Sequence, residues 1–158
     1  MASVSNPLFY GPRQRFAIIL FCLAMAACKP HTKIYQSDCD SEHKFIKVSF
    51  AHLLDSLPFY DHKYIETTGI YREGKEKSAL YNNGDYNKPD NKALWVNFSQ
   101  DCELYLKGTH IGFFEYDNGA FLKIDNKKMR IRGKIDINNR GHLKQYKGCI
   151  DRISLVEL

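Results

Sequence analysis

The alternation of apolar and polar residues along the chain predicts a protein made mostly of β-strands. In residues 125–136, DNKKMRIRGKID, the apolar side chains of Met129, Ile131 and Ile135 fall on one face of a strand and the basic side chains on the other. Similar alternation, with many β-branched and aromatic residues, marks further stretches. In all, we expect strands at residues 63–72, 77–82, 92–99, 127–137 and 147–157.

One segment has the period of a helix instead. Its apolar residues share a single stripe because they stand at positions i, i+3, i+4 and i+7, and they are Phe50, Leu53, Leu54 and Leu57. Ser49 is a suitable N-cap residue, and Pro58 ends the pattern because proline cannot continue a helix. The sequence therefore predicts one short helix whose stripe packs against the strands.

A hairpin is expected between the third and fourth of these strands. In IGFFEYDNGAFLKI, the pair Asn118 and Gly119 stands between two apolar runs. Asn-Gly is a preferred pair for a tight hairpin turn, because the central residues of such a turn need positive φ angles. The hairpin would therefore be an addition to the five longer strands.

Two of the long strands carry a glycine at the same place. The segments DHKYIETTGIY, which starts at Asp61, and DNKKMRIRGKI, which starts at Asp125, align without a gap and superimpose Gly69 on Gly133. Strands that need a residue without a side chain at a fixed depth often bend there, as happens when a small barrel closes. The alternative is a coincidence between two ordinary strands that each carry a glycine at a bulge.

Five strands with long first and fourth members that contain glycine follow the plan of an OB-fold, a partly open Greek-key barrel. Over residues 45–157 the chain resembles small OB-like domains of uncharacterised bacterial envelope lipoproteins, and the likeness lies in LPFYDHK, ALWVNFS and GKIDINNRGHLKQYKGCI. The resemblance implies a small five-stranded OB-like barrel over residues 45–158, with one short N-terminal helix. The hairpin would be inserted where OB-folds more often place a helix. The alternative is another small β-barrel or a sandwich.

The start of the chain has the pattern of an export signal. Arg13 and Arg15 precede an uncharged apolar run, residues 16–27, which is shorter than the roughly 20 residues that a membrane-spanning helix needs. A buried helix of a cytosolic domain is the alternative, but no amphipathic period interrupts the run. We therefore expect residues 1–27 to be a signal peptide.

The end of this run resembles the lipobox of bacterial lipoproteins. The segment from Met25 to Cys28 reads MAAC, and the resemblance implies cleavage before Cys28 and attachment of acyl chains to it. Acyl chains anchor a protein to a bilayer without a spanning helix. Lys29 is similar to the pattern of lipoproteins sent to the outer membrane, so the periplasmic face of that membrane is the expected location. Residues 28–44 are expected to form the lipidated cysteine and a flexible tether.

The remaining cysteines fit an oxidising compartment. Cys39, Cys102 and Cys149 follow the expected cleavage point, and three thiols allow one disulfide with one cysteine left over. The spacing does not decide which two are paired. The sequence has no CxxC motif or Cys/His cluster, so we expect no metal site.

The positive charge is concentrated in one part of the chain. The formal net charge is +5, and residues 126–147 hold eight Lys or Arg against Asp136 alone. On the strand at 127–137, Arg130, Arg132 and Lys134 form a basic patch. This patch either is a solvated face or faces an anionic envelope component, such as lipid headgroups or an acidic glycan. No nucleic-acid partner is expected, because an exported lipoprotein rarely meets RNA or DNA.

Candidate ligand-binding residues follow from the OB-fold by analogy, since ligands of that fold lie on strands 2 and 3 between two loops. On the third strand, Leu94, Val96 and Phe98 are expected to point inward and Trp95 outward, where its indole could stack on a sugar or another ring. Packing of Trp95 under the hairpin or the tether is the alternative, and His142 has an alternative role as a turn residue. The full set of candidates is Trp95, Tyr81, Arg140, His142, Lys144 and Tyr146.

No pattern of a catalytic site occurs in the sequence. It has no GxSxG motif, no HxxxH or HxH spacing and no glycine-rich phosphate loop after a strand. We therefore expect a non-catalytic binding or accessory module of the envelope, without a cofactor, whose partner is an envelope glycan, a lipid headgroup or an envelope protein. The alternatives are a structural or assembly lipoprotein that acts through protein contacts and a hydrolase of envelope polymers.

Overall fold

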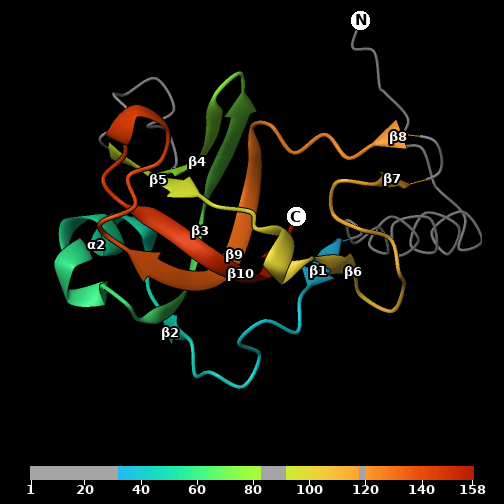
Figure 1. The fold of residues 1–158 in the computed structure, drawn as a ribbon, viewed down its shortest axis with the longest axis horizontal. Coiled ribbons are helices and arrows are strands. Elements are labelled where there is room, and N and C mark those ends of the chain that lie inside the picture. Colours follow the sequence, from blue (N-terminus) through green and yellow to red (C-terminus); the bar gives the residue numbers. More distant parts are fainter. Residues whose placement is uncertain (1–31, 83–91, 118–119) are drawn as a thin grey trace, which may run out of the picture. The chain divides into compact units, whose positions relative to one another are not determined.

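All five long strands predicted from the alternation pattern form. The computed structural model describes residues 32–82, 92–117 and 120–158, so the expected signal peptide, Cys28 and the hairpin turn at 118–119 lie outside the described residues. The five strands, shown in Figure 1, are β3 (Tyr64–Gly74), β4 (Lys77–Tyr81), β5 (Ala93–Val96), β9 (Lys127–Asp136) and β10 (Cys149–Glu157).

These five strands close into a mixed barrel. β3 pairs antiparallel with β4 and with β9, β4 pairs antiparallel with β5, and β9 pairs antiparallel with β10. The closing contact is the parallel pairing of β5 with β10, in which Cys149 lies opposite Trp95. This is the strand arrangement of a small OB-like barrel, so the predicted fold class is confirmed.

The two aligned glycines lie where neighbouring strands approach too closely for a side chain. A Cβ atom on Gly69 would lie 2.6 Å from the carbonyl oxygen of Tyr81, and one on Gly133 would lie 2.7 Å from that of Asp151. Gly133 also lies opposite an irregularity in β10, where the register with β9 shifts between Asp151 and Leu155. The close approach needed for barrel closure therefore explains both glycines.

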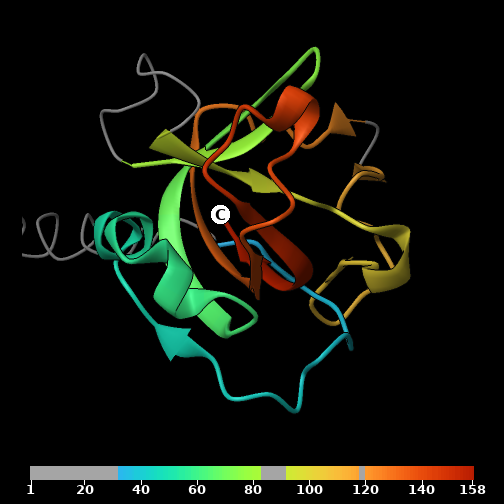
Figure 2. The same cartoon turned by 60° about the vertical axis from the view of Figure 1, so that its left-hand side comes forward.

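The predicted helix covers part of the barrel core. Helix α2 (Phe50–Asp55) begins at Ser49, whose hydroxyl accepts a hydrogen bond from the backbone N–H of His52 at 3.4 Å. A 3-10 helix, η2 (Leu57–Tyr60), follows and contains Pro58. All four stripe residues are buried in the main core with the inward side chains of the strands. Figure 2 shows α2 beside one end of the barrel.

The segment expected to be a flexible tether is partly folded, so this prediction is wrong for its last part. Strand β1 (Ile34–Gln36) pairs with β10, and Tyr35 is buried against Phe113 with their ring centroids 4.9 Å apart. Asp40 binds Arg152 of β10 through two hydrogen bonds, one of them 3.0 Å long, and that pairing lowers the pKa of Asp40. A three-residue strand has too little alternation to be recognised, and its partners are distant in sequence. Strand β2 (Ile46–Lys47) then runs parallel to β3.

Residues 97–126 form an inserted segment between β5 and β9. It contains the 3-10 helix η4 (Gln100–Cys102), strand β6 (Tyr105–Leu106), which pairs with β1, and the predicted hairpin of β7 (Tyr116–Asp117) and β8 (Ala120–Phe121). Cys102 forms a disulfide with Cys39, which settles the pairing that the sequence left open, and Cys149 is free and buried. The inserted segment is therefore tied to the N-terminal segment by a covalent bond and by strand pairing.

Within the described residues, no helix has the length and apolar character needed to cross a membrane.

Candidate functional site

A shallow groove of about 600 Å³ lies across β4 and β5. Its lining comes from the end of β3, the start of β4, the end of β5 and three residues of the inserted segment, and includes Glu73, Lys77, Trp95, Asn97, Phe98 and Phe114. β4 and β5 are the second and third strands of the barrel, so the groove occupies the face on which OB-folds bind ligands. We call it the β4–β5 groove.

Two loops come together at one end of this groove. The β3–β4 turn carries Glu76, and the loop between β9 and β10, residues 137–148, contains the 3-10 helix η5 (His142–Lys144). Nε2 of His142 lies 3.3 Å from a carboxylate oxygen of Glu76. His142 therefore joins the two loops that flank the ligand face of an OB-fold, which differs from its alternative role in a local turn.

Trp95 lies on the floor of the groove and is partly covered. Leu94 and Val96 point into the core, as predicted, and Trp95 points to the opposite side. The backbone of Gly141 lies against the indole, because a Cβ atom there would be 2.6 Å from two ring carbons. The cover thus comes from the β9–β10 loop and not, as in the alternative prediction, from the hairpin or the tether. The rest of the indole lines the groove.

Two of the candidate ligand-binding residues do not line the groove. Tyr81 is 0% exposed and Tyr146 is 1% exposed, and they pack with Ala79 and Ala93 in a second small core on the outer side of β4 and β5. The ring of Tyr146 lies 5.2 Å from that of Trp95. The prediction of ligand contact is therefore wrong for these two tyrosines. They are buried under the β9–β10 loop and pack with Trp95. No local pattern in residues 137–148 indicates that the β9–β10 loop folds over them.

The two basic candidates of the β9–β10 loop differ in their surroundings. Nε of Arg140 donates a hydrogen bond of 2.8 Å to the carbonyl oxygen of Tyr146, so this side chain holds the loop together. Lys144 is exposed. Neither residue belongs to the lining of the β4–β5 groove.

Polar groups of the groove are fixed by hydrogen bonds. The hydroxyl of Ser78 donates to the carbonyl oxygen of Val96 at 2.7 Å, and the amide of Asn97 donates to Asp151 at 3.0 Å. Burial, and then the nearby charge of Asp125, raise the pKa of Glu73 above its usual value. The groove therefore combines partly exposed aromatic rings with fixed polar groups, and its lining carries one Lys and one Glu.

The predicted basic patch is largely paired with carboxylates. Nε of Arg132 donates to Glu66 at 2.6 Å, and Arg130 lies 3.5 Å from the same carboxylate and also pairs with Glu157. Glu66 is only 7% exposed. Burial raises the pKa of Glu66, but the hydrogen bond from Arg132 and the neighbouring positive charges lower it by more. The net shift of the pKa is therefore downward. The ammonium of Lys134 lies 5.8 Å from the ring centroid of Tyr64.

Sequence reasoning missed the role of Glu66. The signal was present in the two aligned strands, because β3 and β9 pair antiparallel and place Glu66 directly opposite Arg132. Both predicted explanations of the patch left out an internal partner. The guanidinium groups of Arg130 and Arg132 face that partner, so they are poorly placed to bind an external polyanion.

The described residues contain neither a metal-binding cluster nor an exposed thiol. Among the described residues, no three His, Cys, Asp or Glu side chains are grouped in a way that could hold a metal ion. Burial, and then the nearby charge of Asp151, raise the pKa of the Cys149 thiol, so this cysteine stays protonated and unreactive.

Comparison of the chain with models of known families, with curated proteins and with solved structures gives no match.

Proposed function

We propose that this protein is a non-catalytic binding module of the bacterial envelope, and that its β4–β5 groove binds a glycan of the envelope. The observation that carries the proposal is the groove itself, whose lining includes the ring of Trp95, the amide of Asn97 and the hydroxyl of Ser78 on the second and third strands of an OB-like barrel. Aromatic rings beside hydrogen-bonding groups suit a sugar ring, which has apolar faces and polar edges.

The location is part of the proposal and rests on the sequence. The export pattern of residues 1–27 and the lipobox-like segment that ends at Cys28 would anchor the protein by acyl chains to the periplasmic face of the outer membrane. An envelope glycan is then a polymer within reach. The pairing of Arg130 and Arg132 with Glu66 supports a glycan over a nucleic acid, because it occupies the charges that a phosphate backbone would need.

Trp95 offers a direct test, because it is the single tryptophan of the chain. Titration with an N-acetylglucosamine tetramer should quench or shift the intrinsic fluorescence in a saturable way if a sugar ring stacks on the indole. By calorimetry, the Trp95→Ala variant should bind at least about fivefold more weakly, since loss of a stacked aromatic ring costs about 1–3 kcal/mol.

The exposed Phe59 on η2 supplies the matched control, because it is an exposed aromatic that does not line the groove. Its replacement by alanine should leave the affinity unchanged. If the fluorescence of Trp95 does not respond to acidic or neutral envelope glycans, or if Phe59→Ala weakens binding as much as Trp95→Ala, the proposed function is wrong.

One observation favours a second function, that of an assembly lipoprotein acting through protein contacts. Phe114 is 57% exposed and Tyr116 is 61% exposed, and both belong to the inserted segment. A hydrolase of envelope polymers has less support, because two carboxylates normally flank the bond that such an enzyme cleaves. Among the described groove residues, Glu73 alone supplies a carboxylate.

A further inference from the structure

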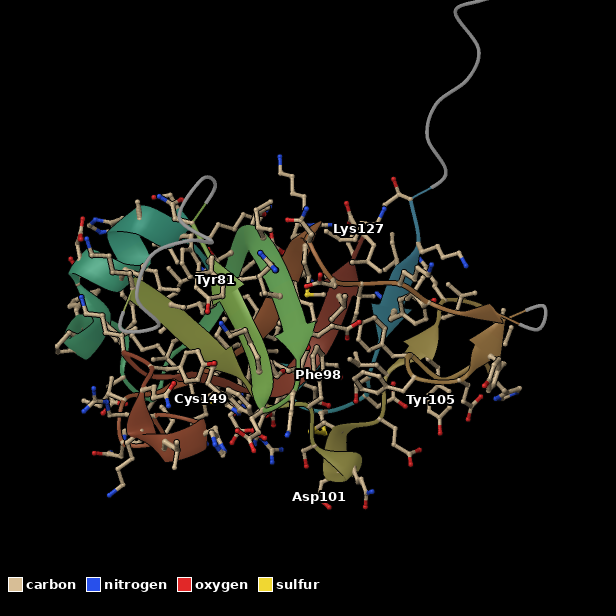
Figure 3. The ribbon with its side chains drawn as sticks, turned by 90° about the horizontal axis from the view of Figure 1, so that it is seen from above. Tyr81, Phe98, Asp101, Tyr105, Lys127 and Cys149 are labelled. Carbon is tan, nitrogen blue, oxygen red and sulfur yellow. A yellow bond between two sulfur atoms is a disulfide. The ribbon has the colours of Figure 1, made fainter. Side chains whose placement is uncertain are left out.

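A second pocket lies within the inserted segment, next to the β4–β5 groove. Its volume is about 220 Å³, which is below the range of about 300–1,000 Å³ typical of sites for drug-sized ligands. It is bounded by the residues that follow β5 and by the turn around Gly112, and it shares Phe98 and Phe114 with the groove. Figure 3 shows Phe98 close to the barrel strands, with Asp101 and Tyr105 on the inserted segment. A pocket of this size suits a single side chain.

Aromatic rings form one wall of this pocket. The ring centroids of Phe98 and Phe113 lie 5.2 Å apart, and those of Phe113 and Phe114 lie 4.8 Å apart. Phe113 is buried and fixes the group to the core, whereas more than half of Phe114 is exposed. The negative faces of such rings attract cations.

Carboxylates stand beside the rings, without a basic side chain among the residues that line the pocket. These carboxylates belong to Glu103 and Glu115. Glu115 accepts a hydrogen bond of 2.9 Å from the backbone N–H of Gly112, and Glu103 accepts one from the hydroxyl of Tyr105. The pocket is thus negatively charged on a chain whose net charge is +5.

The pocket is also held in place before any ligand binds. The backbone N–H of Phe113 donates to the carbonyl oxygen of Leu104 at 2.8 Å, and Cys102 in the lining is bonded to Cys39. Glu115 packs against Gly112 so closely that a Cβ atom there would lie 3.0 Å from the glutamate side chain. Preorganisation of this kind reduces the entropy lost on binding.

We propose that this pocket binds a lysine or arginine side chain of a partner polypeptide, with Phe114 packing on its aliphatic part and Glu103 and Glu115 facing its charge. The charges favour a side chain over a zwitterionic lipid headgroup. A headgroup would bring a phosphate next to its ammonium, and the phosphate would be repelled by the two carboxylates, whereas a basic side chain carries positive charge alone.

The test measures peptide binding to the full chain by fluorescence anisotropy. The probe is a labelled heptapeptide with a central arginine between two leucines, and its matched partner has citrulline, which has nearly the same shape but no charge, in place of arginine. We expect the arginine peptide to bind about fivefold more tightly than the citrulline peptide, because it gains two exposed charge pairs and one cation–π contact.

The variants separate charge from structure. Glu103→Gln combined with Glu115→Gln keeps both hydrogen-bond acceptors, and it should abolish the preference for arginine over citrulline. Glu42→Gln, which changes an exposed carboxylate outside the pocket lining, should preserve that preference. In NMR spectra the amide signals of Gly112 and Phe113 should shift on addition of the arginine peptide.

Three results would overturn the proposal: equal binding of the two peptides, an unchanged preference in the double variant, or displacement of the arginine peptide by phosphocholine as readily as by butylguanidinium. The last result would assign the pocket to lipid headgroups. None of these outcomes depends on sugar binding, because neither glutamate lines the β4–β5 groove and the glycan test uses Trp95.

Discussion

The barrel and the inserted segment are stabilised in different ways. In the barrel, each strand pairs with two other barrel strands around a core of buried aliphatic and aromatic residues. In residues 97–126, the strands are two residues long, and the segment is held by the disulfide to Cys39, by pairing of β6 with β1 and by stacked aromatic rings. The β4–β5 groove lies where these two regions meet, and the pocket lined by Glu103 and Glu115 lies beside it in the inserted segment. The barrel side of the groove is therefore held by continuous strand pairing, whereas the side that comes from the inserted segment depends on a few specific links.

Among the changes considered, removal of the disulfide should lower the free energy of unfolding the most. A crosslink between residues 63 apart in sequence is expected to contribute about 4 kcal/mol to the free energy of unfolding. We therefore expect the Cys39→Ser, Cys102→Ser double variant to lose up to that amount in urea unfolding. Hydrogen exchange should accelerate much more at Leu106 and Phe113 than at Ile131 of β9. Equal acceleration at all three would remove the distinction between barrel and insertion.

A side chain at Gly133 should destabilise the barrel rather than the inserted segment. Gly133→Ala places a methyl group 2.7 Å from the backbone oxygen of Asp151, so we expect a loss of about 3 kcal/mol in the free energy of unfolding. Gly74→Ala is the matched control, since no atom lies within 4 Å of a Cβ there. Similar urea midpoints for the two variants would show that close approach does not explain the glycine.

Replacement of the Glu66 carboxylate should lower the free energy of unfolding by a smaller amount, and that amount should depend on pH. At pH 7, Glu66→Gln should cost about 2 kcal/mol, because it removes charge-assisted hydrogen bonding to the arginines of β9. The pKa of Glu66 is lower in the folded protein than its ordinary value of 4.5. Its contribution is therefore complete above that value and is lost as the pH falls through the folded pKa.

Urea midpoints at pH 7 and pH 3 check this expectation. The difference between wild type and Glu66→Gln should be present at pH 7 and should shrink at pH 3. Glu42→Gln, an exposed site, should match the wild type at both values. A difference that does not change with pH would mean that the charge of Glu66 is not what stabilises the strand pair.

The barrel was predictable because its signals are local. Alternation over ten residues, as in β9, and a stripe over two turns, as in α2, can be recognised without knowledge of distant segments. The shared glycine of β3 and β9 added a signal of closure. The alternation on β5 also predicted the outward direction of Trp95, which lines the groove.

The rest depends on contacts between distant segments. β1 has three residues, and it forms a strand because β10 and β6 lie on either side of it. The choice of Cys102 as the partner of Cys39 follows from the same pairing. Burial of Tyr81 and Tyr146 depends on the path of the β9–β10 loop, and tyrosine is a residue type found both in cores and at binding surfaces.

The bond between Cys39 and Cys102 also sets how the domain responds to mechanical load. A pull applied between Lys33 and Leu158 passes along the chain to Cys39, crosses to Cys102 through the two sulfur atoms and continues towards the C-terminus. Helix α2 and strands β3, β4 and β5 lie between the two cysteines in sequence, so tension bypasses them. While that bond is intact, stretching the ends cannot extend the part of the chain that contains the strands forming the floor of the groove.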